Sequence, residues 1–456
     1  MSRPQFCDRR QMLGSLMGAS LLLPAALSEL LAGDPLPGKA VDPLAAAAPH
    51  FVGKAKRVIF LFMTGGVSHL ESFDPKPRLE ADAGKKHNGR TLLKPQFKFT
   101  RGGKCGTPVS ELFPHVATCL DDICVIRSLT GSHFEHFQAT LGVHTGSLTV
   151  KRPSIGSWVS YGMGTENHNL PSFVVLAPYL PYAGTQVWSS DFLPVVHQGT
   201  RIIPGDEPVR DLRRRAPSQR IQELELDLLA RFNQRHLQQR PTNPLLAGRI
   251  RSFETAYGMQ QAMPEVLDLS QETESTLKLY GLERGLHEGF GWQCLVARRM
   301  AERGVRFIEL IDSGSSNNWD SHGKMADHVP KARSVDQPIA GLLKDLKARG
   351  MLDDTLVVWT TDFGRTPHTD GPTGRSHHPY VFSSWLAGGG VRGGMIYGAS
   401  DDYGYEVAEN GVHIHDFHAT ILHLLGFDHT RLTYRHAGRD FRLTDVAGRV
   451  VHEILA

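Results

Sequence analysis

The fold is decided by the stretch Thr355-Leu-Val-Val-Trp-Thr-Thr-Asp-Phe-Gly-Arg-Thr-Pro367. Five of the six residues 355–360 are β-branched or aromatic, which is typical of a buried central strand. Asp362 and Arg365 follow directly. Because ligands bind just beyond the carboxyl ends of strands in an open parallel sheet, Asp362 is a candidate ligand or catalytic acid. The alternative interpretation is an ordinary polar loop after a strand.

The rest of the chain alternates between short apolar runs and helical patterns. The apolar runs predict further strands at 56–63, 123–126, 173–176, 305–311 and 380–386. Leu and Ala at helical spacing predict a mainly helical insertion or cap over 218–303. This alternation predicts an α/β fold with a doubly wound, mostly parallel sheet sandwiched by helices.

Residues 1–35 are typical of an export signal. Arg9 and Arg10 precede an apolar run at 16–27, and small residues follow it. The paired arginines resemble a twin-arginine signal, whose partner would be the twin-arginine export machinery. We expect a periplasmic or other extracytoplasmic location, with the leader either cleaved or kept as an anchor. A buried N-terminal helix is the alternative, and 36–55 is predicted to be a linker.

Composition and net charge limit the kinds of binding partner that we expect for this chain. The 456 residues are 40% hydrophobic and 21% charged, which is enough for a large core, and the net charge is +3. So small a net charge does not favour nucleic acid or a membrane surface beyond the signal. The five cysteines lack metal-ligand spacing, whereas many of the 23 histidines fall in the motifs below.

Four polar clusters follow four of the predicted strands, at 68–74, 132–136, 317–322 and 362–378. In a doubly wound sheet such loops converge on one edge. Asp and His without Cys are the ligands of a borderline metal such as zinc, or of a harder one such as calcium or manganese. The clusters therefore predict a site for one or two divalent ions, unless they are only solvated loops.

Several segments resemble a known family, the domain-of-unknown-function family 1501. The matching segments are Val58-Ile-Phe-Leu-Phe-Met-Thr-Gly-Gly66, Phe73-Asp-Pro-Lys-Pro77, Trp319-Asp-Ser-His-Gly323, Asp362-Phe-Gly-Arg-Thr-Pro367, Gly374-Arg-Ser-His377, Trp385-Leu-Ala-Gly-Gly-Gly-Val-Arg-Gly-Gly394 and His436-Ala-Gly-Arg-Asp440. That family is similar to the alkaline phosphatase and sulfatase superfamily. The resemblance implies an alkaline phosphatase-like domain over 56–456 with a divalent-metal site.

The resemblance also implies metal ligands. Asp320 and His322 look like one pair of ligands and Asp362 like the acid of another ion; His377 looks like a late ligand, with His378 beside it as a substitute. Two positions depart from the superfamily. Phe363 stands where a histidine usually follows the acid, and the tip at 63–66 has no Asp, so that Glu71 or Asp74 would have to reach in.

The nucleophile is the largest departure. No cysteine precedes an x-Pro-x-Arg motif, so a formylglycine sulfatase mechanism is not expected. His136 occupies the corresponding segment and could be a nucleophile, a ligand or a general acid; Ser132 or a metal-activated water are the alternatives. Arg365 or Arg375 would neutralise an anionic substrate, because guanidinium matches its oxygens.

Together these observations predict an exported metal-dependent hydrolase of phosphate or sulfate esters. Its substrate would be an anionic small-molecule or saccharide ester. The alternative is a metal- or carbohydrate-binding protein on the same scaffold that carries out no chemistry, since fold does not dictate function.

Overall fold

The computed structural model describes residues 44–45, 48–209, 212–240 and 243–456. The predicted leader and half of the predicted linker lie outside these residues. The centre of the fold is a nine-stranded sheet in the order β14-β6-β13-β10-β1-β9-β7-β8, with β17 beside β6. Its strands are β1 (Arg57–Met63), β6 (Ile123–Thr130), β7 (Phe173–Leu176), β8 (Thr200–Ile202), β9 (Phe307–Ile311), β10 (Thr355–Thr361), β13 (Phe382–Ala387), β14 (Met395–Tyr397) and β17 (Val412–His413).

The sheet is mostly parallel, as the sequence predicts. β1 lies between β10 and β9 and runs parallel to both, with Val58 opposite Leu356 and Phe307. All seven residues of β10 are buried, which explains the run of β-branched and aromatic residues there. The exception is β13, which runs antiparallel to both β10 and β6.

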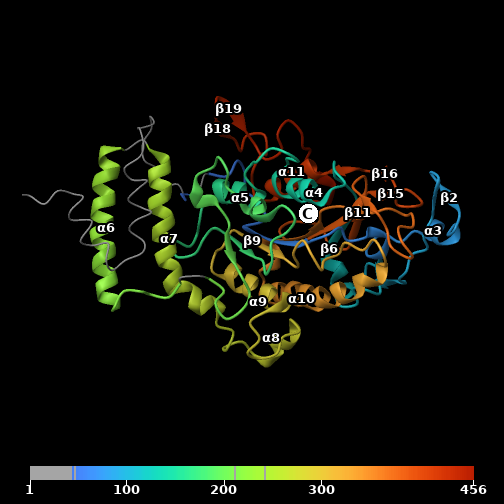
Figure 1. Ribbon diagram of the computed structural model, residues 1–456, viewed down its shortest axis with the longest axis horizontal. Helices are drawn as coiled ribbons and strands as arrows, with labels where there is room; N and C mark the ends of the chain where they lie inside the picture. Colours follow the sequence, from blue (N-terminus) through green and yellow to red (C-terminus); the bar gives the residue numbers. More distant parts are fainter. Residues whose placement is uncertain (1–43, 46–47, 210–211, 241–242) are drawn as a thin grey trace, which may run out of the picture.

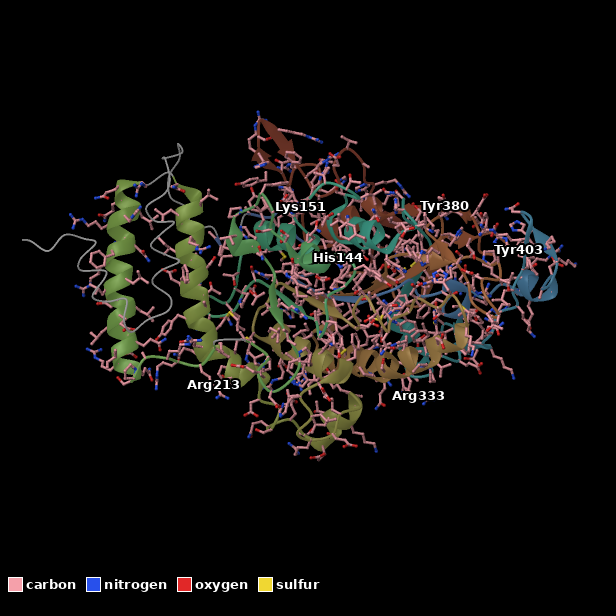
Figure 2. The ribbon with its side chains drawn as sticks, in the orientation of Figure 1. His144, Lys151, Arg213, Arg333, Tyr380 and Tyr403 are labelled. Carbon is pink, nitrogen blue, oxygen red and sulfur yellow. The ribbon has the colours of Figure 1, made fainter. Side chains whose placement is uncertain are left out.

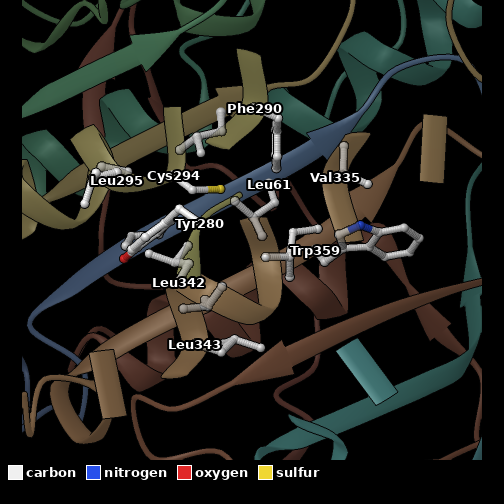
Figure 3. Close-up of a cluster of buried hydrophobic side chains, with 14 of the residues drawn as sticks. Leu61, Tyr280, Phe290, Cys294, Leu295, Val335, Leu342, Leu343 and Trp359 are labelled. Atoms are coloured by element: carbon white, nitrogen blue, oxygen red, sulfur yellow. The ribbon is translucent and has the colours of Figure 1, made fainter. Parts of the chain in front are cut away.

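Helices cover both faces of the sheet (Figure 1). One face carries α4 (His136–Thr145), α5 (Ile155–Met163) and α11 (Ile414–Leu424), and the other carries α9 (Gly289–Glu302) and α10 (His328–Ala348). On the second face, Leu61 and Trp359 of the sheet pack against Cys294 of α9 and Leu342 of α10 (Figure 3). The predicted α/β sandwich is thus confirmed. Among the described residues no helix has the length and apolar character needed to cross a membrane.

The helical region that the sequence indicates at 218–303 has two parts. α6 (Gln219–Gln239) and α7 (Pro244–Leu267) form a hairpin that projects from the sheet layers, whereas α9 belongs to the core (Figure 1). α8 (Glu274–Leu279) lies between the two parts. Both hairpin helices begin at side-chain caps, because Ser218 accepts from the Ile221 N–H and Asn243 from the Leu246 N–H.

The remaining short helix and strands lie outside the central sheet. They are α3 (Pro77–Ala81), β2 (Lys86–His87), β3 (Arg90–Thr91), β4 (Phe99–Gly102), β5 (Thr107–Ser110), β11 (Gly364–Arg365), β12 (His377–His378), β15 (Ala399–Ser400), β16 (Val407–Glu409), β18 (Tyr434–His436) and β19 (Arg439–Phe441). Of these, the β11–β12 pair matters most for the site, because it follows β10 directly.

Candidate metal centre

Five of the predicted site residues meet at the carboxyl edge of the sheet. His136 is the first residue of α4, which follows β6, and Asp362 follows the last residue of β10. Asp320 and His322 lie in the loop after β9, and His377 opens β12. This is the convergence that a parallel arrangement of strands dictates.

The carboxylate of Asp320 lies at the middle of this cluster. Its Oδ1 is 3.0 Å from His322 Nε2 and 3.1 Å from His377 Nε2. Its Oδ2 is 3.3 Å from His136 Nε2. The Nε2 atoms of His322 and His377 are themselves only 2.9 Å apart.

The other nitrogen of each imidazole fixes the tautomer. Nδ1 of each ring faces an acceptor: for His136 it is Asp362 Oδ2 at 2.5 Å, for His322 Asp370 Oδ2 at 2.7 Å, and for His377 the Phe134 carbonyl at 2.7 Å. A neutral ring in this setting carries its proton on Nδ1 and a lone pair on Nε2. If all three rings are neutral, three Nε2 lone pairs converge on one carboxylate, an arrangement that a bound cation accommodates.

The residues present fit a divalent metal. Ligand atoms of His136, Asp320 and His377 all lie within 4.8 Å of one another, so the three could share an ion. His322 Nε2 borders the same space through its contacts with Asp320 and His377. Imidazole and carboxylate are the ligands of zinc and similar transition metals.

Charge is concentrated on His136 and Asp320. Burial alone would disfavour the imidazolium of His136, but Asp362 and Asp320 outweigh it and raise the His136 pKa to about 9. Burial works against the Asp320 carboxylate too, yet hydrogen bonds from His136 and His377 and the nearby Arg365 guanidinium hold its pKa well below the usual range. Without a metal, a proton on His136 thus offsets the negative charge of the cluster.

Arg365 contacts the cluster from the interior of the protein and is fully buried. Its Nη2 donates to Asp320 Oδ1 at 2.7 Å, and its Nε donates to the Gly66 carbonyl at 2.8 Å. Gly66 must be glycine, because its φ is 75° and a Cβ there would lie 2.7 Å from the Phe363 ring. We predicted Arg365 as a substrate-binding residue; a guanidinium without solvent access that is bonded to Asp320 instead positions that carboxylate.

Arg375, the other predicted anion-binding arginine, makes its bonds elsewhere. It is fully buried, and its Nε donates to Glu71 Oε1 at 2.9 Å. Glu71 also accepts the Gln96 backbone N–H at 2.8 Å, so it does not reach into the cluster. Asp74 does not reach it either, because it pairs with Lys76 at 3.0 Å. The Arg375–Glu71 pair holds loops together and presents no guanidinium to a ligand.

His378 turns away from His377. In the β11–β12 pair, His377 lies opposite Arg365 and His378 opposite Gly364, so the two side chains alternate. His378 Nε2 lies 2.6 Å from the Tyr405 carbonyl, and burial lowers its pKa to about 3. The substitution of His378 for His377 that we considered from the sequence has no support in this geometry.

Two residues outside the predicted set of ligands and catalytic groups shape the cluster. Tyr182 stacks on His136 with ring centroids 4.2 Å apart and planes 6° apart. Asn318 donates to the Tyr182 hydroxyl at 3.0 Å and accepts the Asp320 backbone N–H at 2.9 Å. Tyr182 lies in the Pro- and aromatic-rich segment 178–215, and that composition was the available signal.

A pocket of about 320 Å³ adjoins Asp362. Its polar lining includes Ser132, Arg152, Asp362, His413, His415 and Asp445. Ser132 Oγ lies 3.0 Å from His413 Nε2, while His413 Nδ1 accepts the His415 backbone N–H. The His413 proton is consequently on Nε2, so His413 donates to Ser132 and is not placed to activate it as a nucleophile.

Solved structures that resemble this chain include hydrolases and a synthase, all at low identity. The lipoteichoic acid synthase LtaP from Listeria monocytogenes is 9% identical, with 89% of this chain and 80% of that one covered and a TM-score of 0.34. The alkaline phosphatase from the Antarctic bacterium TAB5 is 11% identical, with 82% and 99% covered and a TM-score of 0.33. The PsFucS1 sulfatase from Pseudoalteromonas sp. is 15% identical, with 81% and 68% covered and a TM-score of 0.32.

No curated protein matches the chain. A family model, in contrast, matches residues 55–455, which is nearly everything after the predicted linker. The segments that suggested this family in the sequence include those that deliver Asp320, Asp362 and His377 to the cluster. The chain belongs to the DUF1501 family of proteins of unknown function.

Proposed function

We propose that this protein is an exported metal-dependent hydrolase of phosphate or sulfate esters. The observation that carries the proposal is the convergence of three imidazole Nε2 atoms on Asp320, with every Nδ1 held by an acceptor. Hydrogen bonds to the distal nitrogens of metal-ligating histidines orient the rings and raise their basicity. Export rests on the twin-arginine pattern of the leader.

One transition-metal ion suits the cluster better than two ions or calcium. Calcium prefers six to eight oxygen ligands, whereas imidazoles suit zinc and its neighbours. Asp362 is not free to hold a second ion, since Oδ2 accepts from His136 and Oδ1 accepts from Thr361 Oγ1 at 3.1 Å and from the Phe363 N–H at 3.2 Å. We infer that zinc or manganese binds as a single ion.

An ion held there would supply Lewis acidity to an ester oxygen and acidify a water. The chain itself contributes position and charge. Asp362 holds His136 in one tautomer, and Arg365 fixes Asp320 by a hydrogen bond. The pocket beside Asp362 is in the size range of a small-molecule site, and its Arg152 and Ser132 offer donors to an anionic ester.

The alternative is a metal-binding protein without chemistry, and the ligand count favours it. Four protein ligands close a tetrahedral zinc site, whereas catalytic sites keep one position open. His322 decides between the two, because its side chain is 44% exposed and its partner Asp370 is 39% exposed. A ligand at the solvent edge can exchange for substrate, which favours the enzyme.

The test is an ester screen with defined metal content. The protein, stripped with chelator and reloaded with zinc, manganese or calcium, would be assayed with p-nitrophenyl phosphate, p-nitrophenyl sulfate and a phosphodiester. We expect turnover in a transition-metal form and none in Asp320→Asn. Stoichiometric metal binding without turnover in any form would favour the non-catalytic alternative, and absence of metal binding would refute both.

A further inference from the structure

The α6–α7 hairpin stands apart from the rest of the molecule. α7 packs on the body, where Gly258 approaches Asn169 so closely that a Cβ would lie 2.6 Å from the Asn169 Cα. α6 lies on the far side of α7 (Figure 1 and Figure 2) and is tied to it by Gln222 Nε2, which donates to Gln260 Oε1 at 2.7 Å. The outer face of α6 is therefore turned away from the sheet and from the candidate metal centre.

Charge is distributed very unevenly between this hairpin and the rest of the chain. Residues 212–251 contain nine arginines, no lysine and three acidic residues, whereas the whole chain has a net charge of only +3. The hairpin region thus carries a surplus of six positive charges, and the remainder is net negative. The small net charge of the whole chain is therefore the sum of a basic hairpin region and a net negative remainder.

The outer face of α6 combines arginine with exposed apolar side chains. Positions 221, 224, 228, 231 and 235 follow one another at spacings of three and four residues, so they form one stripe along the helix. Within it Ile221 is 42% exposed and Leu224 is 51% exposed. The side chains of Arg231 and the adjacent Arg220 are each 76% exposed; Arg231 pairs with Asp227 at 2.9 Å and Arg220 lies 3.8 Å from Glu223, both pairs at the surface. We call this set, residues 220, 221, 224, 228, 231 and 235, the α6 stripe.

We propose that the α6 stripe docks the protein on an anionic phospholipid surface. Arginine beside exposed leucine and isoleucine is the pattern of a helix that lies in a membrane interface, where the cations meet phosphate head groups and the apolar side chains enter the acyl boundary.

Two other occupants fit the stripe less well. In a symmetric pair of copies, the stripe would face itself and bring arginine against arginine, which is unfavourable. A soluble polyanion such as nucleic acid would use the arginines, but it would gain little from Ile221 and Leu224. The apolar positions thus select a lipid surface.

The experiment compares vesicle binding by full-length variants, so that the leader contributes equally to all of them. One variant carries Arg220→Glu, Arg231→Glu and Arg235→Glu; a second carries Ile221→Ser and Leu224→Ser. The matched control carries Lys98→Glu, Lys104→Glu and Lys344→Glu, exposed positions on the body. Sedimentation with phosphatidylcholine vesicles, with and without phosphatidylglycerol, measures the partition of each chain.

We expect the arginine variant to lose on the order of a hundredfold in affinity for phosphatidylglycerol vesicles, and the control to lose far less. The Ile221/Leu224 variant should also bind these vesicles more weakly, while its binding to heparin stays unchanged. Equal vesicle binding by wild type and the arginine variant would overturn the proposal. The proposal would also be overturned if the Ile221/Leu224 variant bound vesicles as tightly as the wild type. The same holds if the protein does not bind vesicles and instead self-associates in analytical ultracentrifugation in a way that the stripe variants abolish. Metal content and ester hydrolysis are separate readouts, so the inference stands or falls independently of the proposed function.

Discussion

His136 Nδ1 lies 2.5 Å from Asp362 Oδ2, and this hydrogen bond joins the start of α4 to the end of β10 across 226 residues of sequence. The contact decides what Asp362 can do. A carboxylate oxygen that accepts from a histidine is a support for that histidine, and the histidine is then the ligand. The predictions below follow from this division of roles and from the burial of its neighbours.

Asp362 and Asp320 should respond differently to the same substitution. Asp320→Asn removes a ligand from the centre of the cluster and should abolish metal binding. Asp362→Asn removes only the support of His136 and should weaken affinity by about 10–100-fold, the usual cost of losing such a partner. Metal content after dialysis and competition with a chromophoric chelator would measure both. Equal losses in the two variants would make Asp362 a direct ligand.

The stability of the metal-free protein should fall as pH rises through 9. The His136 pKa is raised from 6.5 to about 9 by Asp362 and Asp320, so its stabilising contribution is complete below pH 6.5 and lost as pH rises through the folded-state value. The contribution is at most about 3 kcal/mol. Urea unfolding of chelator-treated protein between pH 6 and 10 would show it. His136→Gln should remove this dependence; an unchanged slope in that variant would assign it to other groups.

Metal affinity should rise with pH over the same range. Below pH 9 an incoming ion must displace the proton that Asp362 and Asp320 hold on His136. Competition with one proton corresponds to about a tenfold change in apparent affinity per pH unit. Calorimetry in buffers of different ionisation enthalpy would count the released proton. An affinity that is flat from pH 7 to 8.5 would place His136 outside the ligand set.

Loss of the Arg375–Glu71 pair should lower the free energy of unfolding without changing the affinity for the metal. Both side chains are fully buried and 2.8 Å apart, so Arg375→Met leaves Glu71 as an unpaired buried carboxylate. Such losses cost about 3–5 kcal/mol. Chemical denaturation would give the value, and the double variant with Glu71→Gln should recover part of it. A fully stable Arg375→Met with reduced substrate affinity would restore our sequence-based view of Arg375 as an anion-binding residue.

The ring of Tyr182 should slow the dissociation of the metal, because it stacks on His136 and holds that imidazole in place. Tyr182→Phe keeps the face that stacks on His136, whereas Tyr182→Ala opens space beside that imidazole. We expect the metal to dissociate at nearly the wild-type rate from the first variant and faster from the second. Stopped-flow release to a chelator would compare them. Identical rates would show that the stacking does not hold His136 in place.

The sequence predicted the fold well because burial leaves a local pattern. The strand predicted at 173–176 has the bounds of β7, because its four residues are all buried and apolar. The hairpin projection of α6 and α7 was not predictable, since the spacing of Leu and Ala indicates a helix but not what it packs against.

The candidate site was predictable only as a set of residue types near strand ends. Asp320, His322 and His377 come together as expected, but the sequence cannot tell a buried guanidinium from one that faces a ligand, and both Arg365 and Arg375 are buried. For Asp370 and Tyr182 the sequence indicated at most a polar or aromatic-rich segment, because their roles come from loops that meet only in three dimensions.

The antiparallel course of β13 has a consequence for how this edge of the sheet can change. β10 ends at the edge with Thr361, and β13 starts there again with Phe382, so the twenty residues between them leave and re-enter the sheet at one place. No crossover helix is needed to bring the chain back. The segment that carries Asp362, Arg365, Asp370 and His377 is therefore a single excursion from one edge of the sheet. Residues could be inserted at its exposed turn without rethreading the strands on either side, as long as the buried bonds of Arg365 to Gly66 and of Arg375 to Glu71 are kept.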